Sequence, residues 1–213
     1  NRVVAALHCV DYRALGLETL GRPDQYVQRQ ISRWTTQYRQ SETETIEAME
    51  RLIQWLPENI PSSNDSTIAH GDLRLDNLMF HPSEPRVLAV LDWELSTIGH
   101  PLVDLSYHTI TWRLAPDEFR GLLGYPLAEL GIPDEAAYLQ RYCERTGRAA
   151  IDAREWNFYA AFNLFRLAAI LQGIMKRVID GTANSPQAHD NGQRAKRIAA
   201  AGWRQVQHAG ERT

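Results

Sequence analysis

The sequence is poor in lysine and has no cluster of positive charge. Lys176 and Lys196 are the only lysines among 23 basic residues, and with 26 acidic residues the formal net charge is -3. Acidic and basic residues are mixed along the chain, so it lacks the basic stripe that neutralises nucleic-acid phosphates. We therefore expect no nucleic-acid partner.

Cysteine is equally rare. Cys9 and Cys143 belong to no CxxC motif and show no metal-ligand spacing, which argues against a disulfide framework. Free cysteines suit a reducing compartment, and the first residues show no signal-peptide pattern. We expect a cytoplasmic protein.

Long uninterrupted apolar runs are also missing. The longest apolar stretch, residues 158 to 175, contains Asn163, Arg166 and Gln172, and polar side chains of this kind are rare in membrane spans. We predict a buried helix of a globular core and no membrane partner. With 213 residues, 44% of them hydrophobic, the chain is long enough to bury such a core.

Hydrophobic periodicity predicts mostly helices. A capping box at Ser41 and Glu44 indicates where one of them starts, and Pro57 indicates where it stops. The period changes in TIAH, NLMF and VLAVLD, three short apolar runs between residues 67 and 92 that are typical of strands in a small hairpin. The predicted fold is mainly α with a small β-hairpin region, an α+β fold, with helices over residues 2–15, 25–40, 43–56, 102–115, 134–147, 153–180 and 192–208.

Polar residues stand at the ends of the predicted strands. The segment HGDLRLDN contains His70, Asp72 and Asn77, and the segment LDWE contains Asp92 and Glu94. Taken one at a time, each Asp or Asn fits a turn or a helix cap, because these side chains bond to their own backbone at such places. Taken together, their order and spacing fit a specific chemical function.

Phosphoryl transfer to an alcohol needs a carboxylate that accepts the hydroxyl proton and oxygen ligands that hold Mg²⁺ against the phosphates of ATP. Protein kinases use His-x-Asp-x-x-x-x-Asn, followed by a metal-binding Asp at the end of the next hairpin. His70, Asp72, Asn77 and Asp92 stand in the same order, with the same spacing from Asp to Asn. The motif predicts an ATP- and Mg²⁺-dependent phosphotransferase that acts on the hydroxyl of a small molecule.

HGDLRLDN and LDWE, followed by STIGHPLVDLS at 96 to 106, resemble the aminoglycoside phosphotransferase and choline kinase type of kinase-like fold. The resemblance implies that Asp72 is the catalytic base. It also implies that Asn77 and Asp92 bind Mg²⁺ and, through the ion, the nucleotide. Glu94 is a further candidate ligand of the metal.

The resemblance assigns roles to neighbouring residues as well. His70 becomes a buried organiser of the catalytic loop, and Asp104 becomes the residue that braces this loop. Arg74 either reaches the γ-phosphate or is a solvated loop arginine. His100 stands where the family usually has Asp in a GDP motif, a departure that concerns local packing more than chemistry.

Residues 16–38 and 162–185 are similar to a branch of these phosphotransferases that in some animals is fused to an acyl-CoA dehydrogenase. That branch implies hydroxyacyl-CoA-like substrates in place of aminoglycosides. Kinases of this type have two lobes, yet the residues before 67 contain no strand block and no strand lysine. We expect a C-terminal lobe that needs an N-terminal β-rich lobe of the same protein and is inactive alone. Its expected parts within residues 1–213 are the catalytic and metal motifs at 68–106 and a helical substrate-side subdomain at 107–213.

Two other functions fit the same residues. One is a pseudokinase-like binding module, although such modules usually lose one of Asp72, Asn77 and Asp92. The other is a metal-dependent hydrolase built on the carboxylates, with His100 or His108 as a ligand. No HxH or HExxH pair supports the hydrolase.

Overall fold

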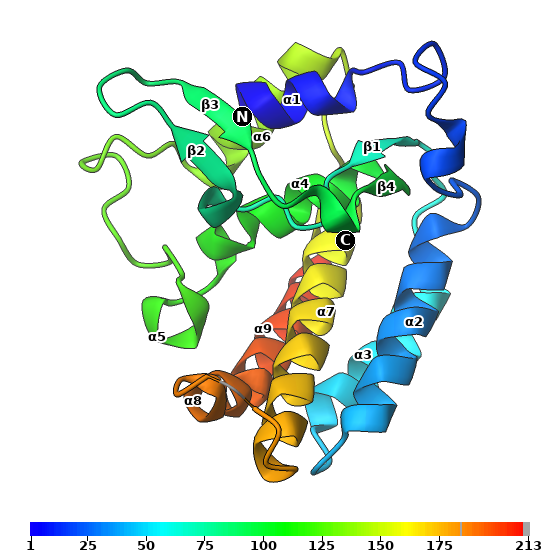
Figure 1. The fold of residues 1–213 in the computed structure, drawn as a ribbon, viewed down its shortest axis with the longest axis vertical. Helices are drawn as coiled ribbons and strands as arrows, with labels where there is room; N and C mark the ends of the chain where they lie inside the picture. The colour runs from blue at the N-terminus through cyan, green and yellow to red at the C-terminus, as the bar shows by residue number, and fades with distance from the viewer. Residues whose placement is uncertain (184, 211–213) are drawn as a thin grey trace.

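The computed structural model describes residues 1–183 and 185–210, so residue 184 and residues 211–213 of the predicted helical subdomain lie outside the described residues. Along the chain, helices come first, four short strands follow, and further helices complete the fold (Figure 1). This is the mainly helical fold with a small antiparallel sheet region that the periodicity predicts.

The central element is helix α7 (Ala153–Ile179). Asp152 caps its N-terminus by accepting hydrogen bonds from the backbone N–H groups of Arg154 and Glu155. By length and composition, α7 is the one helix of the described residues that could cross a membrane, but 78% of its most apolar window is buried inside the protein. This burial supports the prediction of a core helix.

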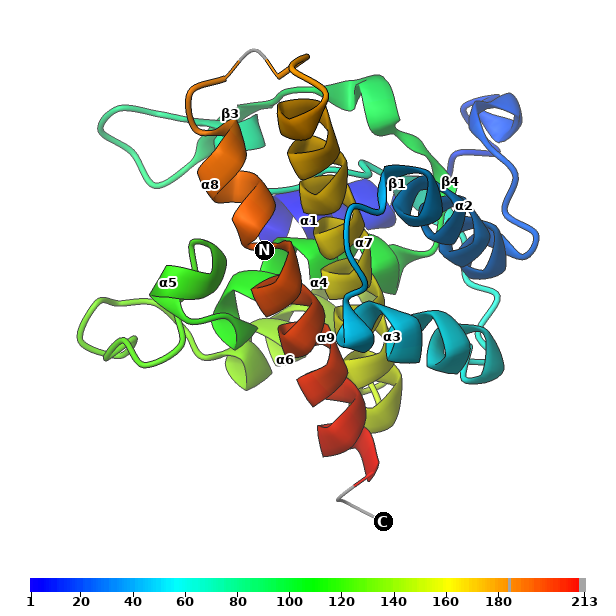
Figure 2. The same cartoon turned by 90° about the horizontal axis from the view of Figure 1, so that it is seen from below.

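Several helices pack against α7. Helix α9 (Ala195–Gly210) lies along it, and α2 (Tyr26–Ser41) and α3 (Glu47–Glu58) pack beside the pair (Figure 1, Figure 2). Gly202 allows the close approach of α9, because a Cβ at this position would lie only 3.2 Å from the Cβ of Leu164. Helices from before and after the strands therefore share one hydrophobic core.

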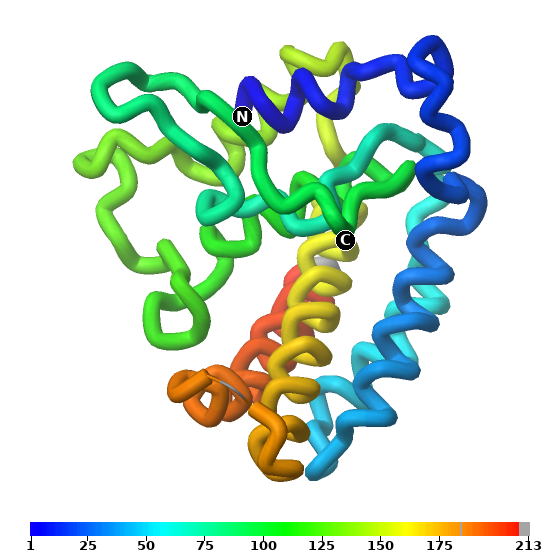
Figure 3. The backbone as a smooth tube through the Cα atoms, in the orientation of Figure 1, coloured from blue at the N-terminus to red at the C-terminus, as the bar shows by residue number. Residues whose placement is uncertain are grey.

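The strands form two separate antiparallel pairs among the described residues. β1 (Thr67–Ala69) pairs with β4 (Thr97–Gly99), and β2 (Leu78–Phe80) pairs with β3 (Val87–Val90). The second pair is the predicted hairpin. The sequence does not predict β4, which forms through its pairing with β1. Figure 3 follows the backbone from β1 through the intervening loop into the hairpin.

Two predicted helix boundaries are wrong, and side-chain hydrogen bonds explain both. The helix predicted over 2–15 ends early, as α1 (Arg2–His8), because the Asp11 carboxylate accepts bonds from backbone N–H groups two and three residues further on and forms a turn. The capping box at Ser41 does not form. Its hydroxyl instead bonds to carbonyl groups of α2, so α3 begins only at Glu47.

The later helices agree better with the prediction. Helix α6 (Glu135–Thr146) matches the helix predicted over 134–147. The prediction over 102–115 becomes α4 (Pro101–Thr109) and the 3₁₀ turn η4 (Ile110–Arg113). The prediction over 192–208 corresponds to α9, which the short helix α8 (Ala188–Gln193) precedes, and a further short helix, α5 (Pro116–Phe119), was not predicted.

Candidate active site

The loop that follows β1 carries the predicted base, and His70 lies at its start. The His70 side chain is completely buried. Its Nδ1 accepts a bond from the backbone N–H of Asp72 at 3.3 Å, and its Nε2 donates to the carbonyl of Leu91 at 2.8 Å. The second bond joins the loop to the chain that leaves β3. This is the arrangement that an organiser of the loop requires.

Asp104, in the first turn of α4, holds the same loop. Its Oδ2 accepts the N–H of His70 and its Oδ1 accepts the N–H of Gly71, both at 2.9 Å, while Nε2 of His8 lies 3.2 Å from Oδ2. Burial raises the pKa of Asp104, but the bonds from His8 and from the loop outweigh burial and hold the pKa below its ordinary value. A buried carboxylate therefore fixes the loop.

Asp72 and Asn77 are in direct contact. The amide nitrogen of Asn77 donates to the Asp72 carboxylate at 2.9 Å and to the Asp72 carbonyl at 2.8 Å. This orients the carboxylate and leaves the amide oxygen of Asn77 for another partner. Nε of Arg74 lies 3.3 Å from Oδ2 of Asp72, so Arg74 faces the predicted base while part of its side chain stays in solvent.

Asp92 reaches this region from the end of β3. Leu91 donates its N–H to the carbonyl of Asn77 and accepts from His70, both at 2.8 Å, and these bonds bring Asp92 next to the loop. The backbone of Asp92 is left-handed, with φ of 66°, a conformation that costs a non-glycine residue on the order of 1–3 kcal/mol. Its side chain makes no cap bond to the 3₁₀ turn η3 (Trp93–Leu95) within the described structure, so the carboxylate remains open to a ligand.

The donor atoms at this place suit magnesium. The amide oxygen of Asn77 and the carboxylate of Asp92 are hard oxygen ligands, and Mg²⁺ takes few such protein ligands because phosphate oxygens and water complete its shell. Glu94 is exposed in η3. The residues that the structure describes contain no group of three or more His, Cys, Asp and Glu side chains that could hold a metal ion.

His100, the departure from the family pattern, caps a helix. Its Nδ1 accepts the backbone N–H of Leu102 at 3.2 Å, and its Nε2 lies 3.1 Å from the hydroxyl of Ser63 and 3.2 Å from that of Tyr159. Burial lowers the pKa of His100 to about 4, so the ring is neutral at pH 7. His100 thus caps α4 as Asp134 and Asp152 cap α6 and α7.

The neutral cap predicts an acid-sensitive fold. The unfolded His100 ring takes up a proton near pH 6.5 and the folded ring only near pH 4, so the unfolded state binds more protons between these values. The free energy of unfolding should fall by up to about 3 kcal/mol for this group as the pH is lowered through that window. Chemical denaturation from pH 4 to 8 measures it. His100→Asn keeps a helix cap but removes the titrating ring. If the free energy of unfolding of this variant depends on pH as strongly as that of the wild type, His100 is not the source of the acid sensitivity.

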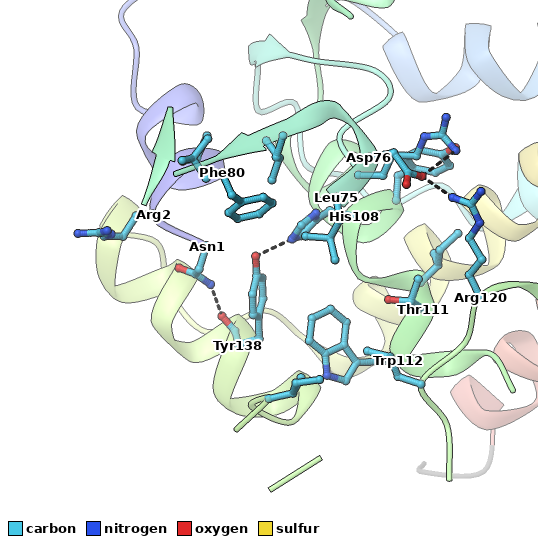
Figure 4. Close-up of a pocket in the computed structure, with 18 of the residues that line it drawn as sticks. Asn1, Arg2, Leu75, Asp76, Phe80, His108, Thr111, Trp112, Arg120 and Tyr138 are labelled. Atoms are coloured by element: carbon cyan, nitrogen blue, oxygen red, sulfur yellow. Dashed lines mark hydrogen bonds and ion pairs between the residues drawn. The ribbon is translucent and has the colours of Figure 1, made fainter. Parts of the chain in front are cut away.

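A cavity of about 560 Å³ opens beside the loop (Figure 4). Tyr107 lines it and lies close to Asp72; burial and then the negative charge of Asp72 raise the pKa of Tyr107 to about 12. The rim and walls contain four arginines, Arg2, Arg74, Arg86 and Arg120, and one acidic residue, Asp76. Most of the wall is apolar, formed by Leu75, Leu78, Phe80, Ile110, Trp112, Phe119, Leu122, Ile132 and Leu167.

His108 and Tyr138 form a polar contact within this wall. Nε2 of His108 lies 2.7 Å from the hydroxyl of Tyr138, and both side chains point into the cavity in Figure 4. Burial lowers the pKa of His108 to about 4 and raises the pKa of Tyr138. The pair is therefore neutral, and His108 is a residue of the cavity wall.

Known proteins resemble this chain over most of its length. Residues 1–161 match the family described as the Phosphotransferase enzyme family. The chain is 46% identical over 206 residues to acyl-CoA dehydrogenase family member 10 of Mus musculus, and 43% identical over 188 residues to family member 11 of Rattus norvegicus. These matches cover 95% and 85% of this chain but only 19% and 24% of the two relatives.

Solved structures show the same fold. A structure from Ralstonia eutropha, provisionally described as an aminoglycoside phosphotransferase, superposes with a TM-score of 0.93 at 58% identity, over 97% of this chain and 63% of that one. Spectinomycin phosphotransferase, solved with ADP and spectinomycin, gives a TM-score of 0.56 at 14% identity, over 97% of this chain and 64% of that one. The chain belongs to the phosphotransferase enzyme family, and its similarity to the branch fused to acyl-CoA dehydrogenases is confirmed.

Sequence reasoning missed two residues that support the loop after β1, His8 through Asp104 and Arg166 by direct contact. His8 comes from α1 and carries no local signal, because only the folded chain brings it to Asp104. Arg166 comes from α7 and donates to the carbonyl of Gly71. Its one signal is that it interrupts an apolar run.

Proposed function

We propose that the complete natural protein transfers the γ-phosphate of MgATP to a hydroxyl group of a small molecule. The observation that carries this proposal is the pairing of Asp72 with Asn77 at the place where the Leu91 bonds bring in Asp92. The family membership supports a kinase-type small-molecule phosphotransferase. The nucleotide, the metal and the acceptor are part of the proposal.

In this mechanism Asp72 accepts the proton of the acceptor hydroxyl as its oxygen attacks the γ-phosphorus and the bond to the leaving ADP oxygen breaks. The Asn77 bond keeps the Asp72 carboxylate oriented toward the acceptor. Asn77 and Asp92 would hold Mg²⁺, which neutralises phosphate charge when bound. Arg74, beside Asp72, supplies a cation to the oxygens of the transferred phosphoryl group.

We propose that the acceptor occupies the cavity beside Tyr107 and is a hydroxyacyl-CoA-like thioester. The apolar walls of the cavity suit the acyl chain of such an acceptor. Its arginines, Arg2, Arg86 and Arg120, suit the anionic groups of the acceptor. A polycationic aminoglycoside would meet repulsion there. The names of the relatives, acyl-CoA dehydrogenase family members 10 and 11, support the same substrate class.

We also propose that an N-terminal lobe of the same protein covers the hairpin side of the site and that residues 1–213 alone are inactive. Large exposed apolar side chains gather there, and such patches mark contact surfaces. They are Leu75, Met79, Phe80, Leu88, Leu91, Trp93 and Leu95, each at least 41% exposed. A cytoplasmic location completes the proposal, supported by the free thiols of Cys9 and Cys143.

Transfer from radiolabelled ATP tests the proposal. The complete natural protein should label 3-hydroxyacyl-CoA thioesters in the presence of Mg²⁺ and should lose this activity when EDTA removes the metal. Kanamycin should stay unlabelled. Labelling of kanamycin but not of thioesters would overturn the acceptor class, and EDTA-resistant transfer would overturn the role of the metal.

A further inference from the structure

Arg166 is a buried cation in the middle of α7. It is 8% exposed. Among the described residues it donates to a carbonyl oxygen and lies over two aromatic rings, and no carboxylate forms an ion pair with it. Burying a charge is costly without strong compensating interactions. The carbonyl group and the two rings therefore have to compensate for burying the charge of Arg166.

The carbonyl belongs to Gly71, in the catalytic loop. Nη2 of Arg166 donates to it at 2.6 Å, while the N–H of Gly71 donates to Asp104 at 2.9 Å. This carbonyl is part of the peptide that leads into Asp72. A cation from α7 and an anion from α4 thus hold the two sides of one glycine. Gly71 has φ of 84°, and a Cβ there would lie 2.6 Å from the carbonyl oxygen of Leu95, so the loop has little freedom to adjust around it.

Tyr107 joins Arg166 to the surroundings of the base. The guanidinium carbon lies 4.8 Å from the centre of the Tyr107 ring and 5.4 Å from that of Trp34, distances at which a cation and an aromatic face attract. Tyr107 also lies near Asp72 and lines the cavity. The same cation therefore supports the peptide before Asp72 and an aromatic side chain beside it.

We propose that Arg166 is a positioning residue for Asp72. Its hydrogen bond orients the peptide between Gly71 and Asp72. The cation–π contact of its guanidinium group holds Tyr107 at the cavity wall. The inference rests on the proposed function, because it takes Asp72 as the base. Lysine is a poor substitute, since an ammonium group has no planar face to stack between the rings of Trp34 and Tyr107.

Arg166→Ala tests the role in the complete natural protein. The kcat for transfer from ATP to a 3-hydroxyacyl-CoA should fall about 10- to 100-fold, because small displacements of a reacting group are costly, and the KM for MgATP should stay unchanged. Low millimolar guanidinium should restore part of the kcat by filling the space between Tyr107 and Trp34. Arg113→Ala is the matched control: Arg113 is a largely buried arginine that bonds to Glu135, and guanidinium should not change its kcat.

Hydrogen exchange gives a readout that needs no acceptor. In Arg166→Ala the backbone amides of residues 68–77 should exchange faster, and guanidinium should slow them again, while α9 exchanges as in the wild type. Wild-type exchange in the loop, or faster exchange in every helix, would overturn the positioning role. Full activity of an Asp72→Asn variant would overturn the proposed function instead, and the exchange result would still decide whether Arg166 holds the loop.

Discussion

Asp72→Asn should abolish phosphoryl transfer in the complete natural protein while MgATP binding stays nearly intact. The amide keeps the shape of the side chain, and its oxygen can still accept the bond from Asn77. An amide is a far poorer proton acceptor, and loss of a general base typically costs about 10²- to 10⁴-fold in rate. Single-turnover transfer from labelled ATP measures the rate, and calorimetric titration with MgATP measures binding.

Asp92→Asn should produce the complementary defect. It removes a negative oxygen ligand from the ion that neutralises the phosphates, so the affinity for MgATP should fall while affinity for ATP in EDTA stays the same. Glu94→Gln is the neighbouring control, and wild-type affinity in this variant would remove Glu94 from the metal shell. Equal binding defects in the Asp72 and Asp92 variants would contradict the separation of base from metal ligand.

Leu164→Ala should cause a large loss of stability through lost burial in α7. Leu164 is completely buried and lies where Gly202 brings α9 against α7. Truncation removes buried methyl groups and leaves a cavity between two helices that cannot easily close it, at a cost of about 2–5 kcal/mol. Chemical denaturation gives the change in the free energy of unfolding.

Ile179 offers the matched control at the end of the same helix. It is 62% exposed, so Ile179→Ala should change the free energy of unfolding by no more than about 0.5 kcal/mol. Similar losses in the two variants would contradict burial as the cause, because helix propensity favours alanine at both positions. An unchanged midpoint for Leu164→Ala would show that this face of α7 is not packed.

The parts of the fold that are predictable from sequence are those whose ends are marked locally. Helix α6 begins after Asp134, which caps it, and stops at Gly147 in the left-handed conformation, and α7 begins after the Asp152 cap. Ser41 gave a wrong prediction because its hydroxyl can either cap the following helix or bond to the preceding one, and in the structure it bonds to α2. Strand β4 escaped prediction because it exists only through its pairing with β1.

The candidate site also has a part that is predictable from sequence and a part that is not. Asp72, Asn77 and Asp92 lie close together in sequence, so their spacing alone indicates a shared purpose. The side chains of His8 and Arg166 support this site from positions far away in the sequence, and only the packing of α1 and α7 brings them to Asp104 and to Gly71. Neither contact has a spacing that a single sequence reveals.

The two hydrogen bonds of the Leu91 peptide have a consequence for local unfolding. One joins the end of β3 to His70 and the other to Asn77, so the hairpin cannot detach without releasing the loop as well. Segments tied in this way open as one cooperative unit. If Asp92 binds the nucleotide as proposed, we therefore expect that binding also stabilises the orientation of Asp72.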